Sequence, residues 1–384
     1  RKVDRVPMLC CKGVFFMVCG RILSMQRVNN FGSLLQSYSL KKILESFGTN
    51  VEFIDIKANI EDNNLLKTKI ITNEEKSAKK SKLLKIDKFF LNRIIIKKKD
   101  NLQNEKFEEF RIRNLNIDEK SNNKKFDTCI IGSDEVFNCA TNKPWGFTSQ
   151  LFGNVDNAAK VITYAASCGG TRFSDLSEAS INKINDSFKK IYSFSVRDEN
   201  TEEFVKKLSN KKVINSLDPV LIGNFDKEIK ENSNIKLPNK FCIIYSYYNR
   251  IDSKEEIKEI KKFCKQNNMK IITLGAPQFW TSNHIVLNPF ELLYAFSKAE
   301  FVITDTFHGT IFASKYSKKF ATIVRKSNEN KLVDLIKRLE KNKHLCKNIK
   351  DINEIYLVNN DINRTNEICE NARKESLEYL KNNI

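Results

Sequence analysis

The segment TDTFHGT, residues 304–310, places one of the three histidines of the chain where α/β proteins often carry out chemistry. The apolar run before it, residues 299–303, predicts a short buried strand, and residues 310–316 predict a helix. His308 would then lie at the carboxyl edge of a parallel sheet, where such folds bind ligands, and the helix beginning beside Gly309 would offer backbone N–H groups to an anion. The alternative is a histidine that only caps its turn or is hydrogen-bonded within it.

Three more predicted strands end in small or polar residues. They follow the apolar runs 126–131, 161–166 and 193–196, and the residues at their ends are Ser133, Asp134, Ser167 and Arg197. Because parallel strands end at the same edge of a sheet, we expect these side chains to converge, and this convergence favours a binding site.

Each of these residues also has an ordinary structural role. Ser133 and Asp134 suit a helix N-cap. Arg197 could fork onto a carboxylate or phosphate of a ligand, but it could equally pair with a nearby protein carboxylate, namely Asp198, Glu199 or Asp218.

The turn over residues 29–33 opens a predicted helix over residues 34–44 and is a further anion-binding candidate. Asn29, Asn30 and Gly32 would supply its backbone N–H groups. Asn also commonly adopts turn conformations for its own sake, and this remains the alternative.

Strand and helix patterns alternate along the chain, which predicts an α/β fold, and 384 residues suffice for two domains. We expect the boundaries in this order: a first domain over 1–222 with a Lys-rich helical insertion at about 60–125, a linker over 223–239, a second domain over 240–360, and a last amphipathic helix over 361–384. The insertion is either a solvated basic helical face or a contact for an anionic membrane surface or acidic polymer.

The amino-acid composition limits the classes of binding partner. A formal charge of +19 favours anionic ones, such as phosphorylated metabolites, acidic glycans or an anionic membrane face, although an evenly solvated basic surface also explains it. No zinc spacing or aromatic–basic motif indicates specific nucleic-acid binding. Ten cysteines without metal-like spacing indicate a reduced, cytoplasmic setting and no metal site. Lys12 and Arg21 interrupt the most apolar stretch, so no transmembrane helix is expected.

Six ordered blocks resemble the polysaccharide pyruvyl transferases, over about residues 24–380. They are RVNNFGSLLQSYSL at 27–40, IGSDEVFN at 131–138, TYAAS at 163–167, SVRD at 195–198, LDP at 217–219, and the segment around His308. The resemblance implies two Rossmann-like domains facing a cleft, as in B-type glycosyltransferases, with the final helix crossing back to the first domain.

The resemblance also implies the reaction: a pyruvyl group moves from phosphoenolpyruvate to sugar hydroxyls of a cell-surface polysaccharide or its precursor, forms a ketal, and phosphate is released. Phosphoenolpyruvate is the donor substrate, and no cofactor is expected. His308 can transfer the protons near neutral pH, and we predict Asp305 as the carboxylate that orients it. We predict substrate contacts from eight residues: Arg197, Asn29, Asn30, Gly32, Ser133, Asp134, Ser167 and Gly309.

Two positions depart from the family pattern. Gln26 stands where members often have His, and Lys331 stands where a later Arg is common. These departures leave open a degenerate, non-catalytic glycan-binding member, and the fold class leaves open a nucleotide-sugar glycosyltransferase. The expected acceptor is a glycan or a lipid-linked sugar, and the expected location is the cytoplasm, with peripheral contact to the inner face of the membrane.

Overall fold

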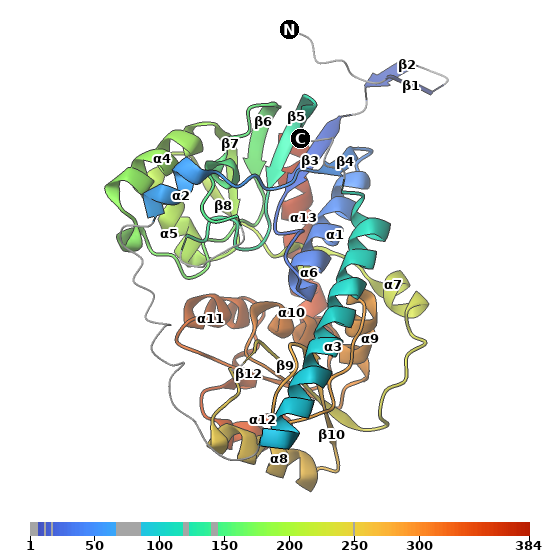
Figure 1. The fold of residues 1–384 in the computed structure, drawn as a ribbon. Coiled ribbons are helices and arrows are strands. Elements are labelled where there is room, and N and C mark those ends of the chain that lie inside the picture. The colour runs from blue at the N-terminus through green and yellow to red at the C-terminus, as the bar shows by residue number, and fades with distance from the viewer. Residues whose placement is uncertain are drawn as a thin grey trace.

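A computed structural model describes residues 7–10, 13–16, 18–66, 86–117, 123–139, 145–248 and 250–384 of the chain. Two parallel β-sheets lie one above the other, with helices around and between them (Figure 1). The described residues also form a small antiparallel hairpin of β1 (Pro7–Cys10) and β2 (Gly13–Phe16), which stands apart from both sheets.

The first sheet has six parallel strands in the order β4-β3-β5-β6-β7-β8. Their bounds are β3 (Cys19–Leu23), β4 (Asn50–Phe53), β5 (Phe126–Ile131), β6 (Ala158–Thr163), β7 (Ile191–Val196) and β8 (Val213–Asn215). Past the strand ends, single bridges join Asp134 to Ala166 and Ala166 to Val196. The carboxyl ends of β5, β6 and β7 therefore meet at one edge, as the polar strand ends predicted.

The second sheet has five parallel strands in the order β10-β9-β11-β12-β13. Their bounds are β9 (Phe241–Ser246), β10 (Lys270–Gly275), β11 (Phe301–Thr304), β12 (Phe320–Ile323) and β13 (Leu345–Cys346). Thr304 pairs with Tyr245, so the residues that follow β11 and β9 share the same sheet edge. Every residue of β9 and β11 is buried, which agrees with the continuous apolar runs expected of parallel strands.

Helices connect the strands and cover the sheets. They are α1 (Phe31–Glu45), α2 (Ile60–Leu66), α3 (Ile86–Phe110), α4 (Glu178–Lys189), α5 (Glu199–Leu208), α6 (Pro219–Ile222), α7 (Asp226–Glu231), α8 (Lys254–Gln266), α9 (Pro289–Lys298), α10 (Phe307–Tyr316), α11 (Glu329–Arg338), α12 (Ile352–Tyr356) and α13 (Ile362–Asn383). Helix α1 begins three residues before the predicted start, because Asn30 caps it by accepting a hydrogen bond from the Ser33 amide at 2.7 Å. Helix α7 lies within the segment expected to be a linker.

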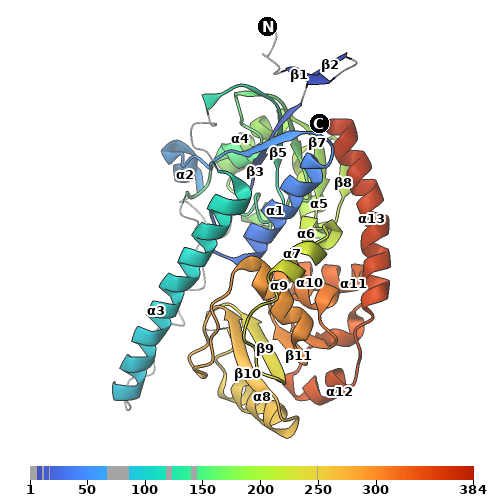
Figure 2. The same ribbon diagram turned by 90° about the vertical axis from the view of Figure 1, so that its right-hand side faces the viewer.

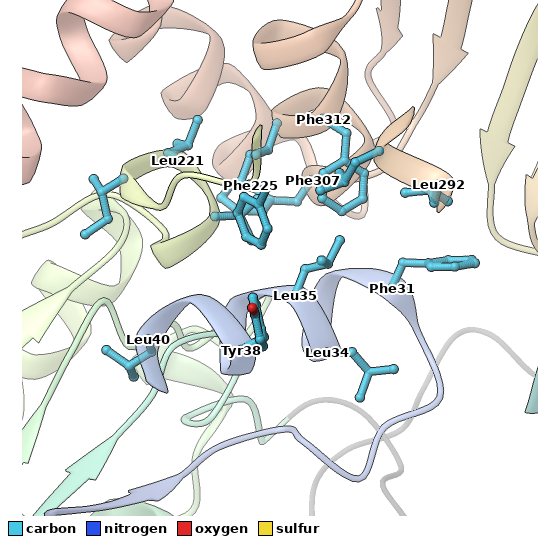
Figure 3. Close-up of a cluster of buried hydrophobic side chains, with 14 of the residues drawn as sticks. Phe31, Leu34, Leu35, Tyr38, Leu40, Leu221, Phe225, Leu292, Phe307 and Phe312 are labelled. Atoms are coloured by element: carbon cyan, nitrogen blue, oxygen red, sulfur yellow. The ribbon is translucent and has the colours of Figure 1, made fainter. Parts of the chain in front are cut away.

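An aromatic core joins the two halves. Figure 3 shows side chains of α1 pointing toward helices that belong to the second sheet. Tyr38 on α1 packs edge-to-face on Phe290 of α9, with ring centroids 5.1 Å apart, and Phe31 approaches Tyr245 of β9 at 6.4 Å. Such aromatic pairs each contribute about 0.5–1.5 kcal/mol beyond burial. One continuous hydrophobic cluster therefore fixes the relative position of the halves.

Helix α3 leaves the first domain and docks on the second (Figures 1 and 2). Lys99 Nζ donates to the carbonyl oxygen of His284 at 2.7 Å, and Gln103 Nε2 donates to that of Leu287 at 2.8 Å. The Leu287 amide donates back to Gln103 Oε1 at 3.3 Å. Part of the predicted Lys-rich insertion is thus an interdomain strap, while its residues 67–85 lie outside the described residues.

Helix α13 runs from the second domain up along the first (Figure 2). The Tyr379 hydroxyl donates to the carbonyl oxygen of Thr163 at 2.9 Å, and Arg373 Nη1 donates to that of Ile222. Helix α13 therefore connects the second domain back to the first. No helix in the described part of the chain has the length and apolar character needed to cross a membrane.

Candidate active site

His308 lies in the first turn of α10, directly after β11. The sequence predicted a helix start at Thr310, but the helix begins at Phe307. The reason is a cap: Thr306 Oγ1 accepts a hydrogen bond from the Gly309 amide at 2.9 Å. Gly309 itself is closely packed, since a Cβ there would lie 2.1 Å from Thr304 Oγ1. Its amide serves the cap and is not free for an anion.

The imidazole of His308 is held between the two domains. Nε2 lies 3.4 Å from Asp218 Oδ2, and the Nδ1 edge lies over Gly32 at the start of α1. A Cβ on Gly32 would come within 2.1 Å of Nδ1, so a larger residue would displace the ring. Asp218 thus faces Nε2, and Gly32 lies against Nδ1.

Asp218 is the carboxylate that faces the imidazole. It is fully buried and caps the short helix α6, where its Oδ1 accepts from the Val220 amide at 3.0 Å. Burial alone would raise its pKa, but the neighbouring His308 and Arg197 outweigh burial and lower the pKa to about 2. Asp218 is therefore anionic at neutral pH.

Arg197 shares the same carboxylate oxygen. Its Nη1 lies 2.9 Å from Asp218 Oδ2, and its guanidinium stacks 4.1 Å from the centre of the Phe307 ring. Burial alone would lower the pKa of Arg197, but Asp218 and Asp134 raise it, so the group stays charged. Its Nε is buried and has no hydrogen-bond partner among the described residues. The salt bridge considered as an alternative is present, and it leaves one donor of the guanidinium unused.

Asp305 lies in a different place from the one predicted for it. Its Oδ2 is 3.3 Å from Arg325 Nε, and its backbone carbonyl accepts from Asn328 Nδ2 at 2.6 Å. Burial raises the pKa of Asp305. Since Arg325 draws this side chain away from the imidazole, the carboxylate beside His308 is Asp218, not Asp305.

Ser133 and Asp134 do not cap a helix. Ser133 is fully buried, and its hydroxyl donates to the Ala165 carbonyl oxygen at 2.9 Å. Asp134 accepts from the Ser33 hydroxyl at 2.6 Å and lies 3.8 Å from Arg197 Nη2. Its φ of 76° is uncommon for a residue other than glycine and is typical of functional turns. Asp134 is thus part of the site, whereas Ser133 supports it from behind.

Ser167 and the two asparagines serve mainly as scaffold. The Ser167 hydroxyl donates to Asp198 Oδ2 at 2.7 Å and is fully buried. The side-chain oxygen of Asn30 is used by the α1 cap, and that of Asn29 accepts from Arg111 Nη2. Asn29 and Asn30 nevertheless line the cavity beside His308.

That cavity has a volume of about 430 Å³ and lies between α1, α3 and the carboxyl ends of β9 and β10. This size is within the range of about 300–1,000 Å³ that is usual for small-ligand sites. Across the described residues, no group of His, Cys, Asp and Glu is arranged to hold a metal ion.

A sequence model described as polysaccharide pyruvyl transferase matches residues 30–327. The chain belongs to this family. It is therefore a transferase, and the family predicted from the six ordered blocks is confirmed. No protein with a curated description matches the chain.

Three solved structures with a similar fold are distant from this chain in sequence. UDP-GlcNAc 2-epimerase from Methanocaldococcus jannaschii, in complex with UDP-GlcNAc and UDP, matches with a TM-score of 0.50 and 11% identity, over 95% of this chain and 100% of the other. The Neisseria meningitidis UDP-GlcNAc 2-epimerase matches with a TM-score of 0.43 and 12% identity, over 96% of this chain and 100% of the other. Acinetobacter baumannii MurG matches with a TM-score of 0.39 and 9% identity, over 95% of this chain and 98% of the other. Such identities concern the fold alone. Two parallel-sheet α/β domains of the B-type glycosyltransferase kind are thus confirmed.

The two departures from the pyruvyl transferase pattern have structural explanations. Gln26 is fully buried, donates to the Ile54 carbonyl oxygen at 2.7 Å and accepts from the Ser24 amide at 3.0 Å, so it braces the end of β3. Lys331 on α11 reaches across the domains to Glu135, with Nζ 2.5 Å from Oε1. Burial alone would lower the pKa of Lys331, but Glu135 raises it, so the ammonium stays charged.

A cationic group of this pyruvyl transferase was missed by the sequence reasoning. The guanidinium of Arg250 stacks on the Tyr247 ring at 4.6 Å, and its Nη1 is buried with no hydrogen-bond partner in the described part of the chain. The Tyr247 hydroxyl lies within electrostatic reach of both Arg250 and Lys331. One signal could have revealed this group: Tyr247 and Arg250 follow β9, which pairs directly with the strand that precedes His308.

Proposed function

We propose that the chain transfers the pyruvyl group of phosphoenolpyruvate to two hydroxyls of a sugar, forming a ketal and releasing phosphate. One observation carries the proposal: His308 and Arg197, 111 positions apart in the sequence, meet at the same oxygen of Asp218. An acid–base group and a cation for an anionic substrate are thus held together at the junction of the domains.

The donor needs cations because phosphoenolpyruvate carries a carboxylate and a phosphate. Arg197 supplies a positive charge beside His308, and Lys331 and Arg250 supply two more around Tyr247. Two of the three retain a buried N–H without a partner among the described residues: Arg197 Nε and Arg250 Nη1. A buried donor without a partner costs about 1–3 kcal/mol, and an oxygen of the substrate would relieve that cost. Arg197 can in addition bind a planar carboxylate in a forked geometry.

The reaction balances with one acid–base group and no cofactor. The first sugar hydroxyl adds to C2 of the donor while C3, a methylene, gains a proton and becomes a methyl group. The bond from C2 to the phosphate oxygen then breaks, and the second hydroxyl adds to C2. One hydroxyl proton in total ends on C3 and the other on the released phosphate. His308 accepts and returns these protons, and anionic Asp218 stabilises the imidazolium between the steps.

The biological setting belongs to the same proposal. The product is a pyruvylated cell-surface polysaccharide or its precursor, an exopolysaccharide included, and the donor is a metabolite of the cytoplasm. A basic chain with formal charge +19 would be attracted to the anionic inner face of a membrane that carries lipid-linked acceptors. Pelleting with anionic vesicles, compared with neutral ones at the same ionic strength, tests this contact.

The test of the activity is phosphate release from phosphoenolpyruvate by the purified chain with a panel of glycan acceptors. We expect release that depends on acceptor and falls by about 10²-fold or more in His308→Ala. Arg197→Lys should weaken protection of the protein by phosphoenolpyruvate against heat, because the forked contact is lost. Arg113→Lys, on an exposed position after α3, is the matched control and should change neither.

Two outcomes would contradict the proposal. Thermal protection by uridine diphosphate with none by phosphoenolpyruvate would indicate a nucleotide-sugar glycosyltransferase. Glycan binding without phosphate release, unchanged in His308→Ala, would indicate a member that binds glycans without catalysis.

A further inference from the structure

His308 borders both a set of charged side chains and a cavity. Arg197 and Lys331 pair with carboxylates at the junction of the domains, and Arg250 stacks on the Tyr247 ring. The imidazole also lines the cavity of about 430 Å³ together with the start of α1. Among the described residues that line this cavity, none is Lys or Arg, whereas the carboxylate of Asp100 is present. Because that carboxylate repels an anion, the cavity suits a neutral ligand.

The walls of the cavity are aromatic. Five rings line it, contributed by α1, α3 and β9 with the turn that follows β9: Phe31, Phe107, Tyr245, Tyr247 and Tyr248. Tyr247 and Tyr248 are 48% and 44% exposed, so part of each ring is accessible to a ligand. Flat rings edged by hydroxyls match a sugar, which has an apolar face and a rim of hydroxyls.

The polar groups of the cavity come largely from α3. Asp100 Oδ1 accepts from the Tyr248 hydroxyl, and Asn104 Oδ1 accepts from Asn29 Nδ2 at 2.9 Å. Within the described part of the chain, the second oxygen of Asp100 and the amide nitrogen of Asn104 have no hydrogen-bond partner. An acceptor and a donor one helical turn apart are thus presented on the same face of the helix.

The position of these two residues is fixed by the docking of α3 on the second domain. Gln103 exchanges two hydrogen bonds with the backbone of Leu287, and Lys99 donates to carbonyl oxygens of Ser282 and His284. This fixation places Asp100 and Asn104 on the wall opposite the first turn of α10, where His308 lies. A rigid helix is a suitable support for selecting among hydroxyl patterns.

We infer that this cavity is the acceptor subsite, that it takes an uncharged pyranose ring, and that Asp100 and Asn104 select the ring by its hydroxyls. The inference rests on the proposed function and adds the chemical class and the recognising residues of its second substrate. The donor then binds at Arg197 and the acceptor in the cavity, both beside His308. Because His308 lines the cavity, its imidazole can take the proton of the attacking hydroxyl.

The experiment measures thermal protection of the full chain by neutral methyl hexopyranosides, by methyl glucuronoside, by phosphoenolpyruvate and by uridine diphosphate. Asp100→Asn and Asn104→Ala are the test variants. Glu105→Gln is the matched control, because it makes the same acid-to-amide change at an exposed position of α3 outside the cavity. We expect at least one neutral hexoside to protect the wild type and Glu105→Gln, and its Kd to rise roughly 10-fold or more in Asp100→Asn and Asn104→Ala.

Thermal protection by phosphoenolpyruvate tests the proposed function independently of this inference. This protection should be unchanged in Asp100→Asn and Asn104→Ala, which also shows that these variants are folded. If phosphoenolpyruvate does not bind the wild type, the proposed function is wrong. The hexoside result then shows by itself whether the cavity binds a neutral sugar. The inference is overturned if no neutral hexoside protects the wild type, if the charged glucuronoside or uridine diphosphate competes for the cavity with higher affinity, or if the two α3 variants lose phosphoenolpyruvate and keep the hexoside.

Discussion

Asp218→Asn should destabilise the protein strongly at neutral pH and progressively less in acid. One oxygen of this fully buried carboxylate serves both Arg197, at 2.9 Å, and His308, at 3.4 Å. The amide keeps the shape of the side chain but removes its charge, and among the described residues the salt bridge that remains to Arg197 is the longer one from Asp134, at 3.8 Å. Removing one partner of a buried ion pair costs about 3–5 kcal/mol.

The pH dependence follows from the low pKa of Asp218. The pKa falls from an ordinary 3.8 to about 2, which corresponds to about 2 kcal/mol of folding free energy. Because the folded-state pKa is the lower one, this stabilisation is complete well above pH 4 and is lost as the pH falls toward 2. About 1 kcal/mol of it should already be lost at pH 3.

The assay is urea unfolding of wild type and Asp218→Asn between pH 5 and pH 3, where the titration of Asp218 dominates the difference between the two proteins. The difference in unfolding free energy should narrow by about 1 kcal/mol over this range. Burial lowers the pKa of His284 and His344 to about 4, and their protonation in the unfolded chain destabilises both proteins equally, so it cancels in the difference. A difference that stays constant or widens in acid would refute the low pKa and the shared-oxygen arrangement behind it.

Two further predictions concern the geometry of the site. Gly32→Ala should lower kcat about 10²-fold with little change in stability, because the added Cβ displaces the His308 ring. Gly170→Ala is the control, because a Cβ at that position meets no atom closer than 3.9 Å. Equal kcat in both variants would contradict the reasoning. Lys331→Met should raise the KM for phosphoenolpyruvate and cost about 1–3 kcal/mol of stability, since it removes the ammonium that pairs with Glu135 across the domain junction. Unchanged KM with lowered stability would assign Lys331 a purely structural role.

Much of the fold could be predicted from the periodicity of apolar residues along the chain. The run 126–131 and the run 241–246 are continuous apolar stretches bounded by polar turns, and they form buried central strands. Prediction erred by a few residues at helix starts, at Phe31 and at Phe307. In both places a side-chain cap, Asn30 or Thr306, begins the helix before its apolar periodicity becomes visible.

The site was predictable in part. The sequence predicts Arg197 and His308 as site residues, because each follows a strand that ends at a sheet edge, which is a local signal. It indicates Asp218 only as a salt-bridge partner of Arg197 and favours Asp305, which is near His308 in sequence, as the orienting carboxylate. Closeness in sequence does not predict contact here. Asp305 lies three residues before His308, but side chains at the end of a strand can point to either side of the sheet edge. Arg325 draws Asp305 to one side, and α6 brings Asp218 to the other.

By itself, the sequence determined the family, the alternation of strands and helices, and the residue types available for proton transfer and anion binding. These properties are local: hydrophobic period, strand-end chemistry and ordered motifs depend on neighbours along the chain. Only the tertiary structure decided which carboxylate faces the imidazole, that Gly32 makes room for its ring, and that a helix of the Lys-rich insertion forms a wall of a cavity lined by neither Lys nor Arg. These outcomes depend on how the aromatic core between the sheets sets the two domains against each other, and contacts between residues a hundred or more positions apart leave no local pattern.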